Sequence, residues 1–91
     1  MRLCYLLLSP TFGMHQYTAD LANRMAQVGH DVHLVTTACY PGHRYGPAIT
    51  VHAPVDTHNT GLSTDALQPG GARRVEQAIT RLRPDVVHAT G

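Results

Sequence analysis

Two kinds of hydrophobic pattern alternate in the first forty residues. Arg2 to Leu8 is an almost continuous apolar run, typical of a strand buried on both faces of a parallel sheet. From Met14 to Val28 apolar residues recur every three or four positions, which predicts an amphipathic helix. Gly29 follows, where a helix end favours a residue with positive φ. Asp31 to Thr37 is rich in β-branched residues and predicts a second strand. A right-handed βαβ unit therefore opens the chain.

The rest of the chain predicts two more strands and one more helix. The stretch "ACYPGHRYGPA" indicates a loop, and Ile49 to Val55 predicts a third strand whose direction stays open. Residues 56–70 look irregular, Pro84 ends the second helix, and Asp85 to Gly91 predicts a fourth strand. We expect a single α/β domain over residues 1–91. Its fold is a partial doubly wound (Rossmann-like) sheet in the order 3-2-1-4, with helices on both faces.

The periodicity also predicts which helix side chains face the core. For the first helix these are Met14, Tyr17, Leu21, Met25 and Val28, and for the second Ala72, Val75, Ile79 and Leu82.

The two cysteines give no metal-ligand spacing. Cys4 fits a small buried hydrophobe, and Cys39 lies in the predicted loop. Two cysteines could form only one disulfide, which does not indicate a disulfide-stabilised scaffold. We therefore expect the protein in the reducing cytoplasm.

Charge and length exclude several function classes. The net charge is +1, and the seven Arg and Lys residues form no stripe, which argues against nucleic acid as the main partner. No apolar run is long enough to span a membrane. Arg73, Arg74, Arg81 and Arg83 predict a solvated helix face, with peripheral contact to membrane lipids as the minor alternative.

Cofactor motifs are also missing. A dinucleotide site needs three glycines after the first strand and an acidic residue ending the second, whereas this chain has Gly13 alone and Thr36-Thr37. No Gly-Lys-Ser/Thr phosphate loop is present. His30 and His33 have no third ligand at workable spacing, so we expect no metal site and no cofactor.

Three stretches in order carry a family resemblance. They are "TFGMHQYTADLANRMAQVGHDVHLVTT", "ITVHAPV" and "LRPDVVHATG". The chain resembles the N-terminal domain of GT-B glycosyltransferases, in particular the retaining family 4 type. The resemblance implies transfer of a sugar from a nucleotide-sugar donor to a sugar, lipid or small-molecule acceptor. It also implies that this domain shapes the acceptor side of the cleft.

The resemblance implies a set of binding residues rather than catalytic ones. By position, Gly13 and Met14 approach the substrate, and His88 matches the histidine at the end of the fourth strand. Phe12 stands where the family often has a first glycine, which predicts an apolar contact with the acceptor. His15 is expected in solvent, with a contact to the acceptor as the alternative. The family's catalytic histidine and paired glutamates would lie beyond this chain, so no catalytic residue is assigned.

The chain ends at the rim of the expected cleft. We therefore expect it to be part of a larger enzyme, completed in the same or another chain, and to be inactive alone. The alternative is a non-catalytic α/β module that associates through the free edge of the fourth strand.

Overall fold

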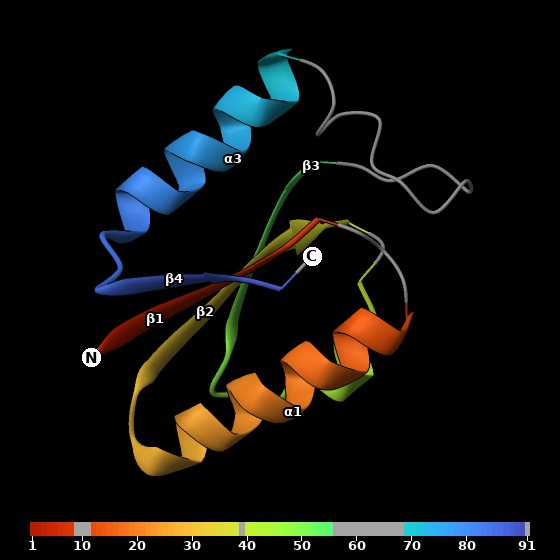
Figure 1. The fold of residues 1–91 in the computed structure, drawn as a ribbon, viewed down its shortest axis with the longest axis vertical. Helices are drawn as coiled ribbons and strands as arrows, with labels where there is room; N and C mark the ends of the chain where they lie inside the picture. Colours follow the sequence, from red (N-terminus) through yellow and green to blue (C-terminus); the bar gives the residue numbers. More distant parts are fainter. Residues whose placement is uncertain (9–11, 39, 56–68, 91) are drawn as a thin grey trace.

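The computed structural model describes residues 1–8, 12–38, 40–55 and 69–90. The described part of the chain contains seven elements, and Figure 1 shows how the helices and strands are arranged. They are β1 (Arg2–Leu7), α1 (Phe12–Val28), β2 (Asp31–Thr37), the 3₁₀ turn η1 (Gly42–Arg44), β3 (Thr50–Val55), α3 (Pro69–Leu82) and β4 (Val86–Ala89). The predicted loop cysteine, Cys39, and residues 56–68 lie outside the described part of the chain.

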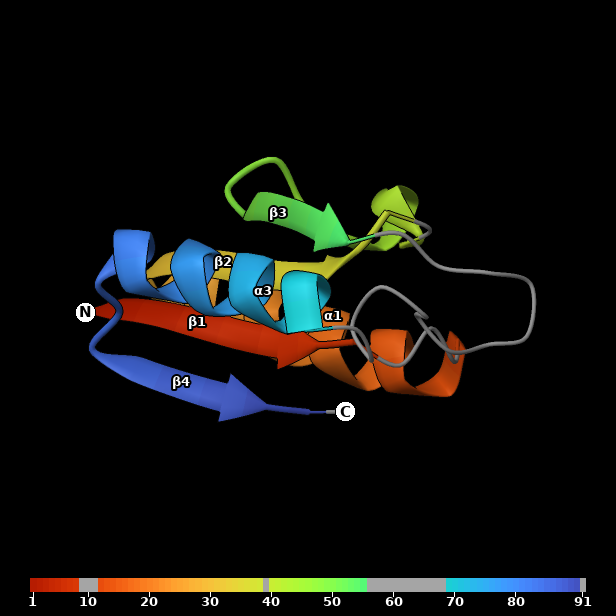
Figure 2. The same ribbon diagram turned by 90° about the horizontal axis from the view of Figure 1, so that it is seen from above.

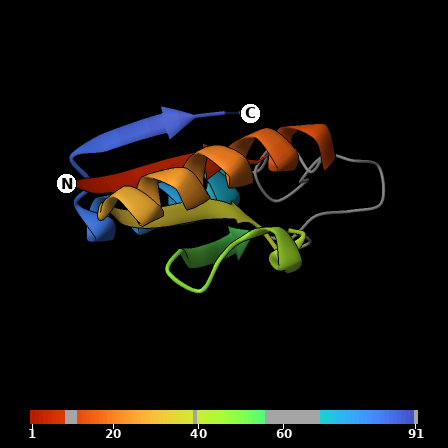
Figure 3. The same ribbon diagram turned by 90° about the horizontal axis from the view of Figure 1, so that it is seen from below.

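The four strands form one parallel sheet in the order β3-β2-β1-β4. This confirms the predicted order, and it answers the open question of the third strand, which runs parallel to its neighbour. Tyr5 of β1 pairs with Leu34 of β2 on one side and with His88 of β4 on the other. Figure 2 shows α3 over one face of the sheet, and Figure 3 shows α1 over the opposite face. The expected helices on both faces are therefore present.

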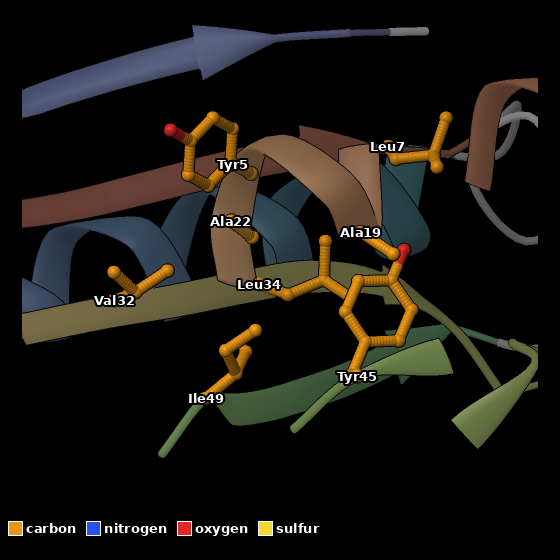
Figure 4. Packing of buried hydrophobic residues seen from close by; sticks show 8 residues of the cluster. All are labelled: Tyr5, Leu7, Ala19, Ala22, Val32, Leu34, Tyr45 and Ile49. Carbon is orange, nitrogen blue, oxygen red and sulfur yellow. The ribbon is translucent and has the colours of Figure 1, made fainter. Parts of the chain in front are cut away.

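The larger core lies between α1 and the sheet. Strand residues that alternate toward this face, such as Tyr5, Leu7 and Leu34, pack against Ala19 and Ala22 of α1. Figure 4 shows these small alanines facing the strands, with Tyr45 reaching in from the β2–β3 connection. Because alanine side chains are short, the helix lies close to the strands at this point.

The second core fills the space under α3. Cys4 and Val35 point to this face and pack against Val75 and Leu82. The burial of Cys4 confirms its prediction as a small buried hydrophobe. The predicted inward face of α3 is right for Val75 and Leu82 but wrong for Ala72, which is exposed.

The predicted inward face of α1 is wrong in part. Tyr17 is 52% and Val28 69% exposed, whereas His15 and Thr18 are buried. The helix is turned so that its smaller residues meet the sheet, and Met14, Leu21 and Met25 flank the contact and are only partly buried. Because Tyr17 is larger than the alanines that occupy the contact, its exposure is compatible with the close packing of helix and strands.

The ends of the elements differ slightly from those predicted. α1 begins at Phe12 rather than Met14, so Gly13 belongs to its first turn and not to the preceding loop. β1 ends at Leu7 instead of Leu8, and β4 covers only the middle of the predicted fourth strand.

At the other end of α1 the prediction for Gly29 is confirmed, since its φ is +108°. Its amide donates to the Ala26 carbonyl (3.1 Å), and the His30 amide donates to the Met25 carbonyl (3.2 Å). This pair of bonds is the Schellman pattern that closes helix carboxyl ends. None of the described helices is long and apolar enough to cross a membrane.

Candidate functional site at the carboxyl edge of the sheet

The carboxyl ends of the strands and the start of α1 meet at one edge of the molecule. In parallel sheets of this type, ligands bind outside the carboxyl ends of the strands where the strand order reverses. Here that point lies between β1 and β4, because β1 is followed in sequence by β2 on one side and neighbours β4 on the other. α1 begins next to this point with Phe12 (Figure 1).

Buried polar side chains gather at this edge. Within the described part of the chain, the buried polar residues are His15, Thr18, Thr36 and Thr37. The first two lie in the opening turns of α1, and the last two end β2. Burial of polar groups is unfavourable unless they are hydrogen-bonded. Their concentration at one edge therefore marks this part of the fold as chemically distinct from the apolar core.

Two threonine hydroxyls connect the elements of this edge. The Thr18 hydroxyl donates to the Thr90 hydroxyl (2.8 Å), which joins α1 to the residue that follows β4. The Thr36 hydroxyl donates to the Leu7 carbonyl (2.6 Å) and joins β2 to the end of β1. The buried Thr37 hydroxyl makes no hydrogen bond to the described residues.

His15 and Tyr45 form a buried polar pair beside these threonines. His15 Nδ1 lies 2.7 Å from the Tyr45 hydroxyl, and the rings meet edge to face at 5.9 Å. Burial lowers the pKa of His15, and the nearby charge of Arg44 lowers it further, so the imidazole is neutral at pH 7. Burial also raises the pKa of Tyr45 to about 12, so its hydroxyl keeps its proton. His15 Nε2 is buried without a hydrogen-bond partner in the described residues.

Asn23 holds the β2–β3 connection against α1. Its side-chain amide donates to the Arg44 carbonyl (2.8 Å), and its side-chain oxygen accepts from the Gly46 amide (2.8 Å). A Cβ at Gly46 would lie only 3.1 Å from that oxygen, so the approach suits glycine. Together with the His15–Tyr45 bond, this contact fixes residues 44–46 against α1, at His15 in its first turn and at Asn23 in its second half.

The predicted site residues fall into two places. Phe12 and Gly13 lie in the first turn of α1, and their side chains are outside those described. Met14 is partly buried and packs against the larger core. His15 is only 1% exposed, so the expectation that it lies in solvent is wrong. Its imidazole is enclosed because α1 turns this position toward the sheet.

His88 lies on β4, where it pairs with Tyr5 of β1. It is exposed on β4, and its ring is 5.6 Å from that of Tyr5 on the α1 face of the sheet. Thr90, two residues later, is the residue that contacts α1. His88 also lines a groove of about 250 Å³ with Leu3 and Val86, among other residues.

Several residues of this edge were not predicted as site residues. Thr36 and Thr37 could have been noted as polar residues that end a strand, because strand ends at this edge are where ligands bind. Thr18 and Tyr45 give no such signal, since their burial depends on the rotation of α1 and on the path of the β2–β3 connection.

The chemistry available at this edge is hydrogen bonding with neutral groups. The hydroxyls and the imidazole suit the oxygen atoms of a hydroxylated or phosphorylated ligand, and helix amino ends favour anions. No group of three His, Cys, Asp or Glu side chains in the described part could hold a metal ion.

The comparisons with known proteins agree with this arrangement. No curated protein and no solved structure matches the chain. One family model does match, that of Glycosyltransferase Family 4, and it covers residues 12–91, from the first turn of α1 through the residue after Thr90. The matched range takes in α1, the three later strands and α3, and so most of the fold described above. The chain therefore belongs to Glycosyltransferase Family 4.

Proposed function

We propose that this chain forms the acceptor-side portion of a retaining glycosyltransferase with the GT-B architecture. The reaction is the transfer of a sugar from a nucleotide-sugar donor to a sugar, lipid or small-molecule acceptor. A donor-binding domain, in the same or another chain, supplies the catalytic groups, and the enzyme works in the cytoplasm. The chain alone is inactive, because its carboxyl edge holds neutral hydrogen-bonding groups and no acid–base pair among the described residues.

The observation that supports this proposal is the buried polar edge. The buried polar residues of the described part all lie here: His15 and Thr18 in the opening turns of α1, and Thr36 and Thr37 at the end of β2. Sugars are bound through their many hydroxyl groups, which require such donors and acceptors. Phe12 and Gly13 begin the helix at the same edge, so the acceptor contact proposed for them belongs to the same region.

The complete gene provides the first test. The gene that encodes this chain should also encode, or lie beside a gene for, a second Rossmann-like domain with paired glutamates. The assembled protein should release nucleoside diphosphate from a nucleotide sugar when the acceptor is present, whereas the 91-residue chain should not. Retention is read from the anomeric configuration of the product by NMR. Absence of the second domain, or product of inverted configuration, would contradict the corresponding part of the proposal.

A substitution tests the acceptor contact. Phe12→Gly in the assembled enzyme should change the KM for the acceptor and leave the KM for the donor unchanged. Tyr17→Ala is a suitable control, since Tyr17 is 52% exposed on the same helix. Equal acceptor kinetics in the wild type and the Phe12 variant would remove Phe12 from the site.

A second candidate function is association through β4. All four residues of this strand are exposed, and Val86 and Val87 are each 45% exposed. Parallel sheets are normally covered on both faces, and an open apolar edge favours pairing with another chain. In this alternative the chain is a non-catalytic module that pairs through β4.

A further inference from the structure

A groove lies between β3 and the carboxyl-terminal half of α3. Its volume is about 480 Å³, within the range of small-ligand sites, and it is lined by His52, Ala53, Pro54, Ala78, Arg81 and Leu82. In Figure 2 β3 is seen next to α3, and the Arg74 side chain donates to the Pro54 carbonyl (3.0 Å), which joins the two elements. The groove is therefore on the opposite face of the sheet from α1 and its buried polar residues.

His52 reaches this groove from β3. It pairs with Val35, which packs under α3, and paired residues of neighbouring strands point to the same face. Its Nε2 lies 3.1 Å from Nδ1 of His33 on β2, and Nε2 of His33 lies 3.0 Å from the Asp31 carboxylate. A carboxylate and two imidazoles thus follow one another in a row that ends at the groove.

The carboxylate decides where the hydrogens of this row lie. The hydrogen bonds of Arg2 and His33 lower the pKa of Asp31, so its side chain is ionised and can only accept. His33 therefore carries hydrogen on Nε2, and with one hydrogen on each ring its Nδ1 is an acceptor. His52 then donates from Nε2, and its Nδ1 is left as an acceptor without a partner among the described residues.

The surroundings of His52 favour a bound anion that also carries a hydrogen-bond donor. Burial, and then the charge of His33, lowers the pKa of His52, so its imidazole is neutral at pH 8. Arg81 supplies a positive charge and forms no ion pair within the described part of the chain. None of the described lining residues is acidic. Beside the apolar side chains of Pro54 and Leu82, hydrogen bonds are stronger than in water.

We propose that this groove binds a small hydroxylated anion, in which a hydroxyl group donates to His52 Nδ1 and the anionic group accepts from the Arg81 guanidinium. Asp31 and His33 are positioning residues that fix the tautomer of His52. The donor is a hydroxyl because Arg81 would repel an ammonium group. The anion is a carboxylate or a phosphate, as in a hydroxy acid or a sugar phosphate, since a guanidinium binds both. The inference goes beyond the proposed sugar transfer and does not depend on it.

The first experiment titrates four probes into the ¹⁵N-labelled 91-residue chain at pH 8. Glucose 6-phosphate and gluconate carry both groups, whereas glucose carries only hydroxyls and methyl phosphate only the anion. At least one of the first two should shift the His52 ring signals and bind about tenfold tighter than either control, since each control loses one contact. Binding of only one of them identifies the anion as phosphate or carboxylate. No shift, or equal affinity for all four probes, would overturn the proposal.

The second experiment assigns the two contacts with the probe that binds tighter. Arg81→Gln should weaken its binding about tenfold, and Arg73→Gln should leave it unchanged, because Arg73 is exposed on the same helix but does not line the groove. His52→Phe keeps a ring without an acceptor and should also weaken binding about tenfold. Urea denaturation checks that this variant is folded. Arg81 is exposed, so its variant carries the test independently, and wild-type affinity in Arg81→Gln would overturn the proposal.

The third experiment tests the positioning residues by ¹⁵N NMR of the histidine rings at pH 8. In the unbound chain His52 should carry its hydrogen on Nε2. Asp31→Ala should reduce this preference and weaken probe binding. Asp85→Ala should change neither, because Asp85 contacts Arg2 as Asp31 does but does not contact His33. A hydrogen on His52 Nδ1 in the wild type would overturn the proposal, since the groove would then hold no acceptor.

Discussion

At the scale of single residues, Gly29 has the clearest energetic role. Its φ of +108° is one that side-chain-bearing residues rarely adopt. A Cβ at this position would meet no atom within 4 Å, so the effect of adding one comes from the backbone alone. Gly29→Ala should therefore lower the free energy of unfolding by about 1–2 kcal/mol. The measurement is urea denaturation of both chains.

The control for Gly29 is Gly42→Ala. Gly42 lies in η1 without a positive φ, and its added Cβ would make an ordinary 3.4 Å contact with the Tyr40 ring. This change should alter the free energy of unfolding by less than about 0.5 kcal/mol. Equal losses in the two variants would show that the left-handed backbone at Gly29 is not the cause.

Residue patterns predicted the existence of α1 but not its rotation. Periodicity counts apolar residues, so it assigned Tyr17 to the core and His15 to solvent. The helix instead presents Ala19 and Ala22 to the sheet, because small side chains allow the closest approach. His15 lies on the same face of α1 as these alanines, so it is buried too, and its ring is hydrogen-bonded to Tyr45. Tyr45 belongs to the β2–β3 connection, whose sequence has no periodic pattern that would predict this contact. The buried polar pair was therefore beyond what sequence spacing predicts.

At the scale of elements, a chain of polar contacts joins the amino ends of three strands. Arg2 of β1 binds Asp31 of β2 (2.9 Å), and Asp31 lies 3.0 Å from His33 Nε2. His33 Nδ1 in turn lies 3.1 Å from Nε2 of His52 on β3. The hydrogen bonds of Arg2 and His33 lower the pKa of Asp31, in that order of size. The carboxylate therefore stays charged at neutral pH, and β1, β2 and β3 are connected side by side.

This contact chain predicts a loss of stability in mild acid. Burial, and then the charge of His33, lowers the pKa of His52 from 6.5 in the folded state. As the pH falls below about 6.5 the unfolded chain takes up a proton that the folded chain does not, so the free energy of unfolding decreases. Stability should be greatest above pH 7 and should fall toward pH 5.5. Urea denaturation at several pH values measures this dependence.

Substitution of His52 isolates its share of that dependence. His52→Gln should flatten the fall between pH 7 and 5.5 without abolishing it, since His15 also has a lowered pKa and contributes in the same direction. His43→Gln, at an exposed position of η1, is the control and should keep the wild-type slope. A His52 variant with the wild-type slope would contradict the assignment.

At the scale of the whole molecule, the sequence predicted the sheet but not which end-of-strand residues meet. The order β3-β2-β1-β4 was predicted from the usual doubly wound arrangement, in which the first strand is central and a later strand returns to its other side. The site depends on finer geometry. His88 was predicted at the cleft from its place in a motif, yet the residue that contacts α1 is Thr90, two positions along the strand direction. Because side chains on a strand alternate between its faces, His88 and Thr90 lie on the same side of the sheet. Of the two, Thr90 is the one that accepts a hydrogen bond from Thr18.

The exposed edge of β4 gives the last prediction. Val87 lies on the side of β4 toward α3, paired with Cys4, and is 45% exposed. If β4 pairs with another copy of the chain, a charge at Val87 should disrupt that pairing, as edge lysines do in natural sheets. Sedimentation velocity should find the wild type associated and Val87→Lys monomeric. Gln77→Lys, an equal charge on the exposed face of α3, should leave the association intact. A monomeric wild type, or dissociation by both lysines, would rule out β4 as the contact and leave the transferase role as the better account of this edge.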